Sequence, residues 1–188
     1  MKNKLTPILT HNKNILLIAL AVALILLVPL IAMQFSDDVD WSIFDFAVAG
    51  GLLFGTGLAY ELLTRKSGIS EYRAALGVAL AGALLLVWIN LAVGIIGSED
   101  NPANSMYLGV LAVAGFGALL ARLRPGGMAG VMFATALAQA AVTVIALLTE
   151  PHPDVYQLVL LNGFFVALWA ASAVLFWRAN TELNRRLE

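Results

Sequence analysis

The stretch ILLIALAVALILLVPLIAM, residues 15–33, contains 19 residues without a charge. A helix needs about 20 apolar residues to cross a hydrocarbon core of about 30 Å, so this stretch predicts a membrane span. It follows Lys2, Lys4 and Lys13, as the core of a secretory signal would, but it is longer than a usual signal core and lacks a small-x-small exit. We therefore expect it to be retained as the first transmembrane helix.

Further apolar runs follow, and the whole series predicts an all-α integral membrane protein with six transmembrane helices. The expected helices cover approximately residues 14–34, 43–63, 74–97, 106–123, 128–148 and 155–177. Because the connections are short, consecutive helices are expected to be antiparallel neighbours within one transmembrane domain, residues 1–188. The composition agrees, since 61% apolar residues in a chain of 188 exceed what a soluble domain of this length buries.

Positive charges occupy alternate breaks between the apolar runs. All 11 Lys and Arg residues fall at the N-terminus, in the second or fourth connection, or at the C-terminus, and the other connections carry acids instead. Short cytoplasmic loops retain Lys and Arg during insertion. The pattern therefore predicts that both termini are cytoplasmic, in a bacterial-type inner membrane. The net charge of -1 gives no indication of a nucleic-acid partner.

Small residues recur every four positions in several of the expected helices, most clearly at Ala47, Gly51, Gly55 and Ala59. Helices in lipid associate by close backbone approach, so such ridges mark helix contacts. We interpret this ridge as a packing surface. A hinge or a pore lining is the functional alternative.

Polar side chains inside the expected spans gather at one depth. Asn90, Gln139, Thr143 and Asn162 lie five to nine residues inside the acid-bearing ends of three spans, or roughly 7 to 14 Å at 1.5 Å per residue. Polar groups in hydrocarbon need partners. The four residues are therefore candidate ligands for a small polar solute, and the alternative is an interhelical hydrogen-bond cluster that only holds the bundle together.

Acids surround the expected mouth of such a pocket, and they would attract cations or amines and repel anions. The candidate rim residues are Asp45, Glu99, Asp100, Glu150 and Asp154. Asp45 has a second interpretation, because an acid at a helix N-terminus is favoured by the macrodipole. His152 lies between two of these acids and is a weak candidate for a metal ligand, the alternative being a solvated acidic loop.

Glu61 is an intramembrane carboxylate near the basic end of the second expected helix. A salt bridge with Arg65 or Arg73 would neutralise it, and a proton-relay role is the alternative. The chain contains no cysteine, which excludes disulfides and thiolate chemistry.

Enzyme motifs are absent: the sequence has no G-x-S-x-G, no HExxH, no P-loop and no paired aspartates for magnesium. We expect a non-catalytic protein without a cofactor, in contact with the lipid bilayer. The leading hypothesis is a transport-like or channel-like protein that binds a small polar or cationic solute in an outward-facing vestibule. The alternative is an accessory or scaffold subunit that binds another membrane protein or forms a homo-oligomer.

Overall fold

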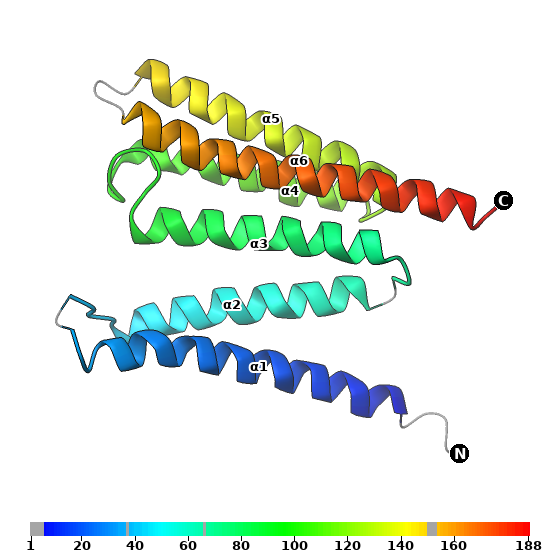
Figure 1. Cartoon of the computed structure of the whole chain (residues 1–188), viewed down its shortest axis with the longest axis horizontal. Coiled ribbons are helices and arrows are strands. Elements are labelled where there is room, and N and C mark those ends of the chain that lie inside the picture. Colours follow the sequence, from blue (N-terminus) through cyan, green and yellow to red (C-terminus); the bar gives the residue numbers. More distant parts are fainter. Residues whose placement is uncertain (1–5, 37, 66, 150–153) are drawn as a thin grey trace. The chain divides into compact units, whose positions relative to one another are not determined.

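The computed structural model describes residues 6–36, 38–65, 67–149 and 154–188. The elements found there are helices (Figure 1): α1 (Thr6–Ala32), α2 (Ile43–Thr64), α3 (Ser70–Ala92), the 3-10 helix η1 (Pro102–Ser105), α4 (Met106–Leu120), α5 (Pro125–Thr149) and α6 (Val155–Arg185). Within the described residues, six helical segments are long and apolar enough to cross a membrane. The prediction of an all-α protein with six membrane spans is therefore confirmed.

The chain forms two compact units, Met1–Arg65 and Lys66–Glu188. We call them the N-terminal unit and the C-terminal unit and describe each by itself. The expectation of a single domain over residues 1–188 stays a prediction.

The N-terminal unit is a helical hairpin in which α2 runs back along α1 (Figure 1). Glycines on one face of α2 allow this approach. A Cβ atom on Gly57 would lie 2.8 Å from Cγ2 of Ile18, and one on Gly50 would lie 3.3 Å from Cδ1 of Leu26. Helices in lipid associate through such small residues, so this face of α2 is the one that holds α1.

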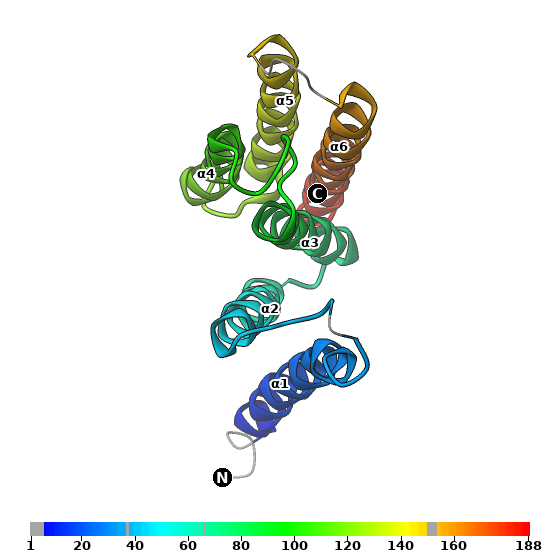
Figure 2. The same ribbon diagram turned by 90° about the vertical axis from the view of Figure 1, so that its left-hand side faces the viewer.

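In the C-terminal unit, α6 packs against both α3 and α5, and α4 packs against α5 (Figure 2). Consecutive helices are thus neighbours for α4, α5 and α6, as expected, but α3 packs along α6 rather than along α4. Two contacts explain this pairing. The Oγ of Ser172 donates to the backbone O of Ala75 at 2.9 Å, and the ring of Trp169 comes within 3.2 Å of where Gly82 would carry a Cβ.

Helix α3 ends at Ala92, five residues before the predicted end at residue 97. Gly94 and Gly97 have φ values of +71° and +66°, a left-handed conformation that glycine adopts without a steric cost and that stops a helix. The predicted span ran past both glycines because the residues around them are apolar.

The segment that follows α3 is folded back and fixed by one side chain, Asn104. Its Oδ1 accepts hydrogen bonds from the backbone N of Ile95 at 3.0 Å and of Ile96 at 2.9 Å. Its Nδ2 donates to the backbone O of Ile96 at 3.2 Å and of Ser98 at 2.7 Å. Both isoleucines are 2% exposed. Asn104 therefore satisfies backbone groups that would otherwise be buried without partners.

The remaining differences lie at helix ends. Helix α1 begins at Thr6 rather than at residue 14. Helix α6 continues to Arg185, eight residues past the predicted end of the span, as the polar continuation of a single helix.

Candidate functional site

Two of the four predicted polar residues meet inside the C-terminal unit. The Nε2 of Gln139 on α5 donates to the Oδ1 of Asn162 on α6 at 2.8 Å, and both side chains are at most 1% exposed. Each side chain thus gives a polar group of the other a hydrogen-bond partner within the apolar interior. Of the four predicted residues, the structure thus brings Gln139 and Asn162 together.

Two aromatic residues complete the arrangement. The hydroxyl of Tyr107, in the first turns of α4, donates to the same Oδ1 of Asn162 at 3.1 Å. The Nε1 of Trp169 on α6 donates to the Oε1 of Gln139 at 3.4 Å. Both rings are buried, with 2% and 0% exposure. We call Tyr107, Gln139, Asn162 and Trp169 the polar cluster.

The sequence did not reveal the two aromatic members of the cluster. Tyr107 lies at the start of an apolar run, where a tyrosine is typical of the membrane interface. Trp169 lies in the middle of α6. A buried indole or phenol needs a hydrogen-bond partner. That requirement was the only feature of the sequence that could have pointed to these two residues.

The other two predicted ligands turn back to their own helices. The hydroxyl of Thr143 donates to the backbone O of Gln139 at 3.0 Å, and the Nδ2 of Asn90 donates to the backbone O of Leu86 at 2.7 Å. Asn90 is only two residues from the end of α3, because that helix is shorter than predicted. Its Oδ1 is the one buried side-chain N or O atom of the described residues without a hydrogen-bond partner.

The described candidate rim acids lie at helix ends and in one loop. Glu99 and Asp100 are exposed between α3 and η1. Asp154 is the N-cap residue of α6, and its Oδ1 accepts from the backbone N of Gln157 at 3.1 Å. Glu150 and His152 lie outside the described residues.

Asp45 belongs to the N-terminal unit and forms a capping box at the start of α2. Its Oδ2 accepts from the backbone N of Ser42 at 2.7 Å, and its own backbone N donates to the Oγ of Ser42 at 3.2 Å. This reciprocal pair satisfies two of the free donors of the helix end. The geometry agrees with the capping interpretation of Asp45.

Glu61, on α2, accepts a hydrogen bond at its Oε1 from the Nδ2 of Asn14 on α1, at 2.8 Å. Within the described part of the chain, no ion pair joins Glu61 to Arg65. The amide of Asn14 is the observed partner of Glu61, and it links the two helices of the N-terminal unit. The salt bridge between Glu61 and Arg73 stays a prediction.

The cluster offers hydrogen bonds and aromatic surface but contains no carboxylate, imidazole, amine or guanidinium group. The described residues contain no group of three or more His, Asp or Glu side chains placed to hold a metal ion. The Oδ1 of Asn162 already receives two donors, and the Oε1 of Gln139 receives one. The hydrogen bonds of the cluster therefore join α4, α5 and α6 through their own side chains.

Comparisons with protein-family models, with curated proteins and with solved structures gave no match to this chain.

Proposed function

We propose that this polytopic membrane protein is a non-catalytic accessory or scaffold subunit for another membrane protein. The observation that carries the proposal is the polar cluster, whose side chains are buried and bonded to one another. A solute site in hydrocarbon needs donors and acceptors that are free to replace water. Here the best-placed acceptor, Oδ1 of Asn162, is used twice within the protein, which favours a structural role.

The N-terminal unit offers the surface that such a role requires. Gly51 and Gly55 of α2 are exposed, and nothing lies within 4 Å of where either would carry a Cβ. They belong to the small-residue ridge of the sequence, whereas Gly50 and Gly57 are the glycines that approach α1. Because small residues permit close helix contact in lipid, we propose that the ridge receives a helix of the partner protein.

Site-specific cross-linking tests this proposal. A photoreactive amino acid is placed at Gly51, and a control carries it at Leu137, an exposed position of α5 in the C-terminal unit. Illumination in native membranes should give one discrete protein adduct from position 51 and only lipid adducts from position 137. Equal labelling at both positions, or none at position 51, contradicts the proposed contact. An adduct of two copies of this chain would indicate that the ridge binds a second copy in a homo-oligomer and not a different protein.

The proposed orientation has both termini in the cytoplasm of a bacterial-type cell, and the charge distribution of the sequence supports it. The chain contains no cysteine, so single-cysteine variants report on one position each. Cysteines at Ser36, Ser98 and Thr149 should react with a membrane-impermeant thiol reagent in intact cells. Cysteines at Ser67 and Asn184 should not, and labelling at Ser67 would contradict the orientation.

A solute-binding, transport-like role is the second candidate, and one atom favours it. The Oδ1 of Asn90 is buried without a hydrogen-bond partner, and Glu99 and Asp100 follow the same helix end. An acceptor without a partner, on a helix that exposed acids follow in the chain, suits a water molecule or an amine.

Binding of a panel of cations and amines by the purified protein tests the second candidate. The comparison variant carries Glu99→Gln, Asp100→Asn and Asp154→Asn, which should fold normally because solvated charges contribute little to stability. The attraction should weaken with added salt, since exposed charges are screened over about 8 Å at physiological ionic strength. Equal binding by wild type and variant across the panel removes this candidate.

A further inference from the structure

The arginines of the C-terminal unit gather at one end of it. They come from the places where α3 begins, α4 ends, α5 begins and α6 ends, which lie together in Figure 1. The arginines are Arg73, Arg122, Arg124, Arg178, Arg185 and Arg186, and the side chains of all six are exposed. They outnumber the acids at this end of the described unit, which are Glu71, Glu182 and Glu188.

Two contacts bring the α4–α5 connection between the start of α3 and the end of α6. The hydroxyl of Tyr72 donates to the backbone O of Leu123 at 3.1 Å. A Cβ atom on Gly126 would lie 2.9 Å from the Oδ1 of Asn180, so α5 starts in direct contact with α6. Arg73 follows Tyr72, Arg122 and Arg124 flank Leu123, and Arg178 is two residues before Asn180. These contacts place three separate chain segments, each with arginines, beside one another.

The backbone of this connection is held in an uncommon conformation. Arg122 and Leu123 are consecutive residues with φ values of 51° and 57°, in the left-handed region that non-glycine residues rarely adopt. Such backbone persists where the surroundings fix it, and the bond from Tyr72 to Leu123 is one such constraint. The arginines on either side of Leu123 are thus presented by a fixed turn.

The arginines differ in their depth relative to the apolar runs. Arg73, Arg122, Arg124 and Arg178 lie within two residues of the end of an apolar run, or about 3 Å along a helix. The headgroup layer extends about 5 to 7 Å beyond the hydrocarbon core on each side. These four arginines are therefore at the depth of lipid phosphates. Arg185 is the last residue of α6 and lies about 12 Å beyond Trp177, and Arg186 follows it as the C-cap residue.

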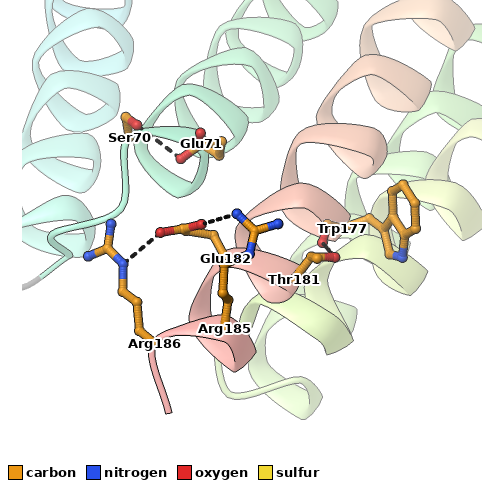
Figure 3. Close-up of polar contacts among 7 residues, drawn as sticks. All are labelled: Ser70, Glu71, Trp177, Thr181, Glu182, Arg185 and Arg186. Carbon is orange, nitrogen blue, oxygen red and sulfur yellow. Dashed lines mark hydrogen bonds and ion pairs between the residues drawn. The ribbon is translucent and has the colours of Figure 1, made fainter. Parts of the chain in front are cut away.

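The two groups also differ in their partners. Glu182 binds the distal arginines, with its Oε2 3.2 Å from Nη1 of Arg185 and its Oε1 2.9 Å from Nε of Arg186 (Figure 3). Among the described residues, the four arginines at headgroup depth form no ion pair. Trp177, an exposed residue that is drawn in Figure 3, adds an aromatic ring of the kind found at headgroup level.

We propose that Arg73, Arg122, Arg124 and Arg178 form a binding surface for the phosphate headgroup of an anionic phospholipid. The guanidinium group matches phosphate oxygens with two parallel hydrogen bonds. The depth of the arginines and the neighbouring tryptophan favour a membrane lipid over an acidic segment of a soluble protein. This inference is independent of the proposed scaffold function, because it concerns a different unit and a different ligand.

Native mass spectrometry of the full chain in a neutral detergent tests the proposal. Phosphatidylglycerol and phosphatidylcholine with identical acyl chains are added, and the ratio of bound lipids is measured. Wild type should prefer phosphatidylglycerol. In the variant Arg122→Gln/Arg124→Gln that preference should fall roughly 25-fold, because each arginine near the surface contributes about fivefold. The matched control Arg185→Gln/Arg186→Gln removes the same charge and should keep the preference within about twofold, because its arginines lie beyond the headgroups.

A second variant guards against misfolding. Arg122→Lys/Arg124→Lys keeps both charges but not the two-point geometry, and it should retain an intermediate preference. Equal binding of both lipids by wild type overturns the proposal, as does an equal loss in the two glutamine variants. Displacement of phosphatidylglycerol by a polyglutamate peptide would assign the surface to an acidic protein segment instead.

Discussion

The two units of this protein use the same kind of sequence in different ways. In the N-terminal unit, α2 buries Ala49 and Thr64, and the most apolar part of α1 buries no side chain. In the C-terminal unit, α6 alone buries Phe165, Trp169 and Phe176 completely. Both units are apolar enough to span a membrane. Hydropathy therefore identifies the spans, and burial shows which of them hold their own tertiary structure.

Lipid explains how such a difference persists. An apolar side chain that faces hydrocarbon gains little from being transferred into a protein core, so a helical hairpin is not forced to bury its surface. What gives the C-terminal unit its internal contacts is specific geometry, namely the Trp169 ring against Gly82 and the bonds of the polar cluster. The N-terminal unit has less of this geometry, and its α2 ridge is the surface that we propose for a partner.

The largest expected effect on this comparison comes from Trp169→Ala. The ring is 0% exposed, and removal of a buried aromatic side chain costs about 3 to 5 kcal/mol in unfolding free energy. The matched change Phe44→Ala removes a ring that is 74% exposed on α2, and it should cost less than about 0.5 kcal/mol. Unfolding in a mixed-micelle titration measures both. Equal losses would remove the distinction between the units.

Asn104→Ala is expected to have the next largest effect. It removes the acceptor for two buried backbone N–H groups, and buried groups left without partners cost about 1 to 3 kcal/mol each. The comparison is Asn14→Ala in the N-terminal unit, which breaks one bond to Glu61 near a helix end and should cost about 0.6 kcal/mol. If the same titration gives Asn104→Ala no larger cost than Asn14→Ala, the folded-back segment is not held as described.

Gly127→Ala and Gly51→Ala sharpen the comparison with a single methyl group. At position 127 the new Cβ would lie 2.9 Å from Cβ and 3.3 Å from Cα of Ala121, and such overpacking costs about 1 to 3 kcal/mol. At position 51 nothing lies within 4 Å. There the purified protein should be unchanged or slightly more stable, because alanine favours a helix. Destabilisation at position 51 would mean that the ridge is already occupied within the chain.

The sequence predicted the spans because hydropathy and loop charge are properties of single segments. Each predicted helix overlaps an observed one. The predicted end of the α3 span was five residues too late, because Gly94 lies within an apolar run. The same error explains the predicted depth of Asn90, which was measured from residue 97 rather than from Ala92.

The candidate site was predictable only in part, because it depends on which helices are neighbours. Gln139 and Asn162 could be placed at similar depth from their own helices. Tyr107 and Trp169 could not be added, since their role follows from the packing of α4 and α6 around α5. Likewise the four backbone bonds of Asn104 require a fold-back that no local pattern specifies.

The coupling between Gln139 and Asn162 tests most directly the claim that the polar cluster is closed on itself. Unfolding free energies are measured for Gln139→Leu, Asn162→Leu and the double variant, with Thr143→Val as the control partner. Because interhelical hydrogen bonds in lipid contribute about 0.6 to 1.7 kcal/mol, the pair should be non-additive by about that amount. Thr143→Val should be additive with Asn162→Leu, since the Thr143 hydroxyl bonds its own helix. Additive losses for Gln139 and Asn162 would contradict the account, because they would mean that the two side chains do not meet.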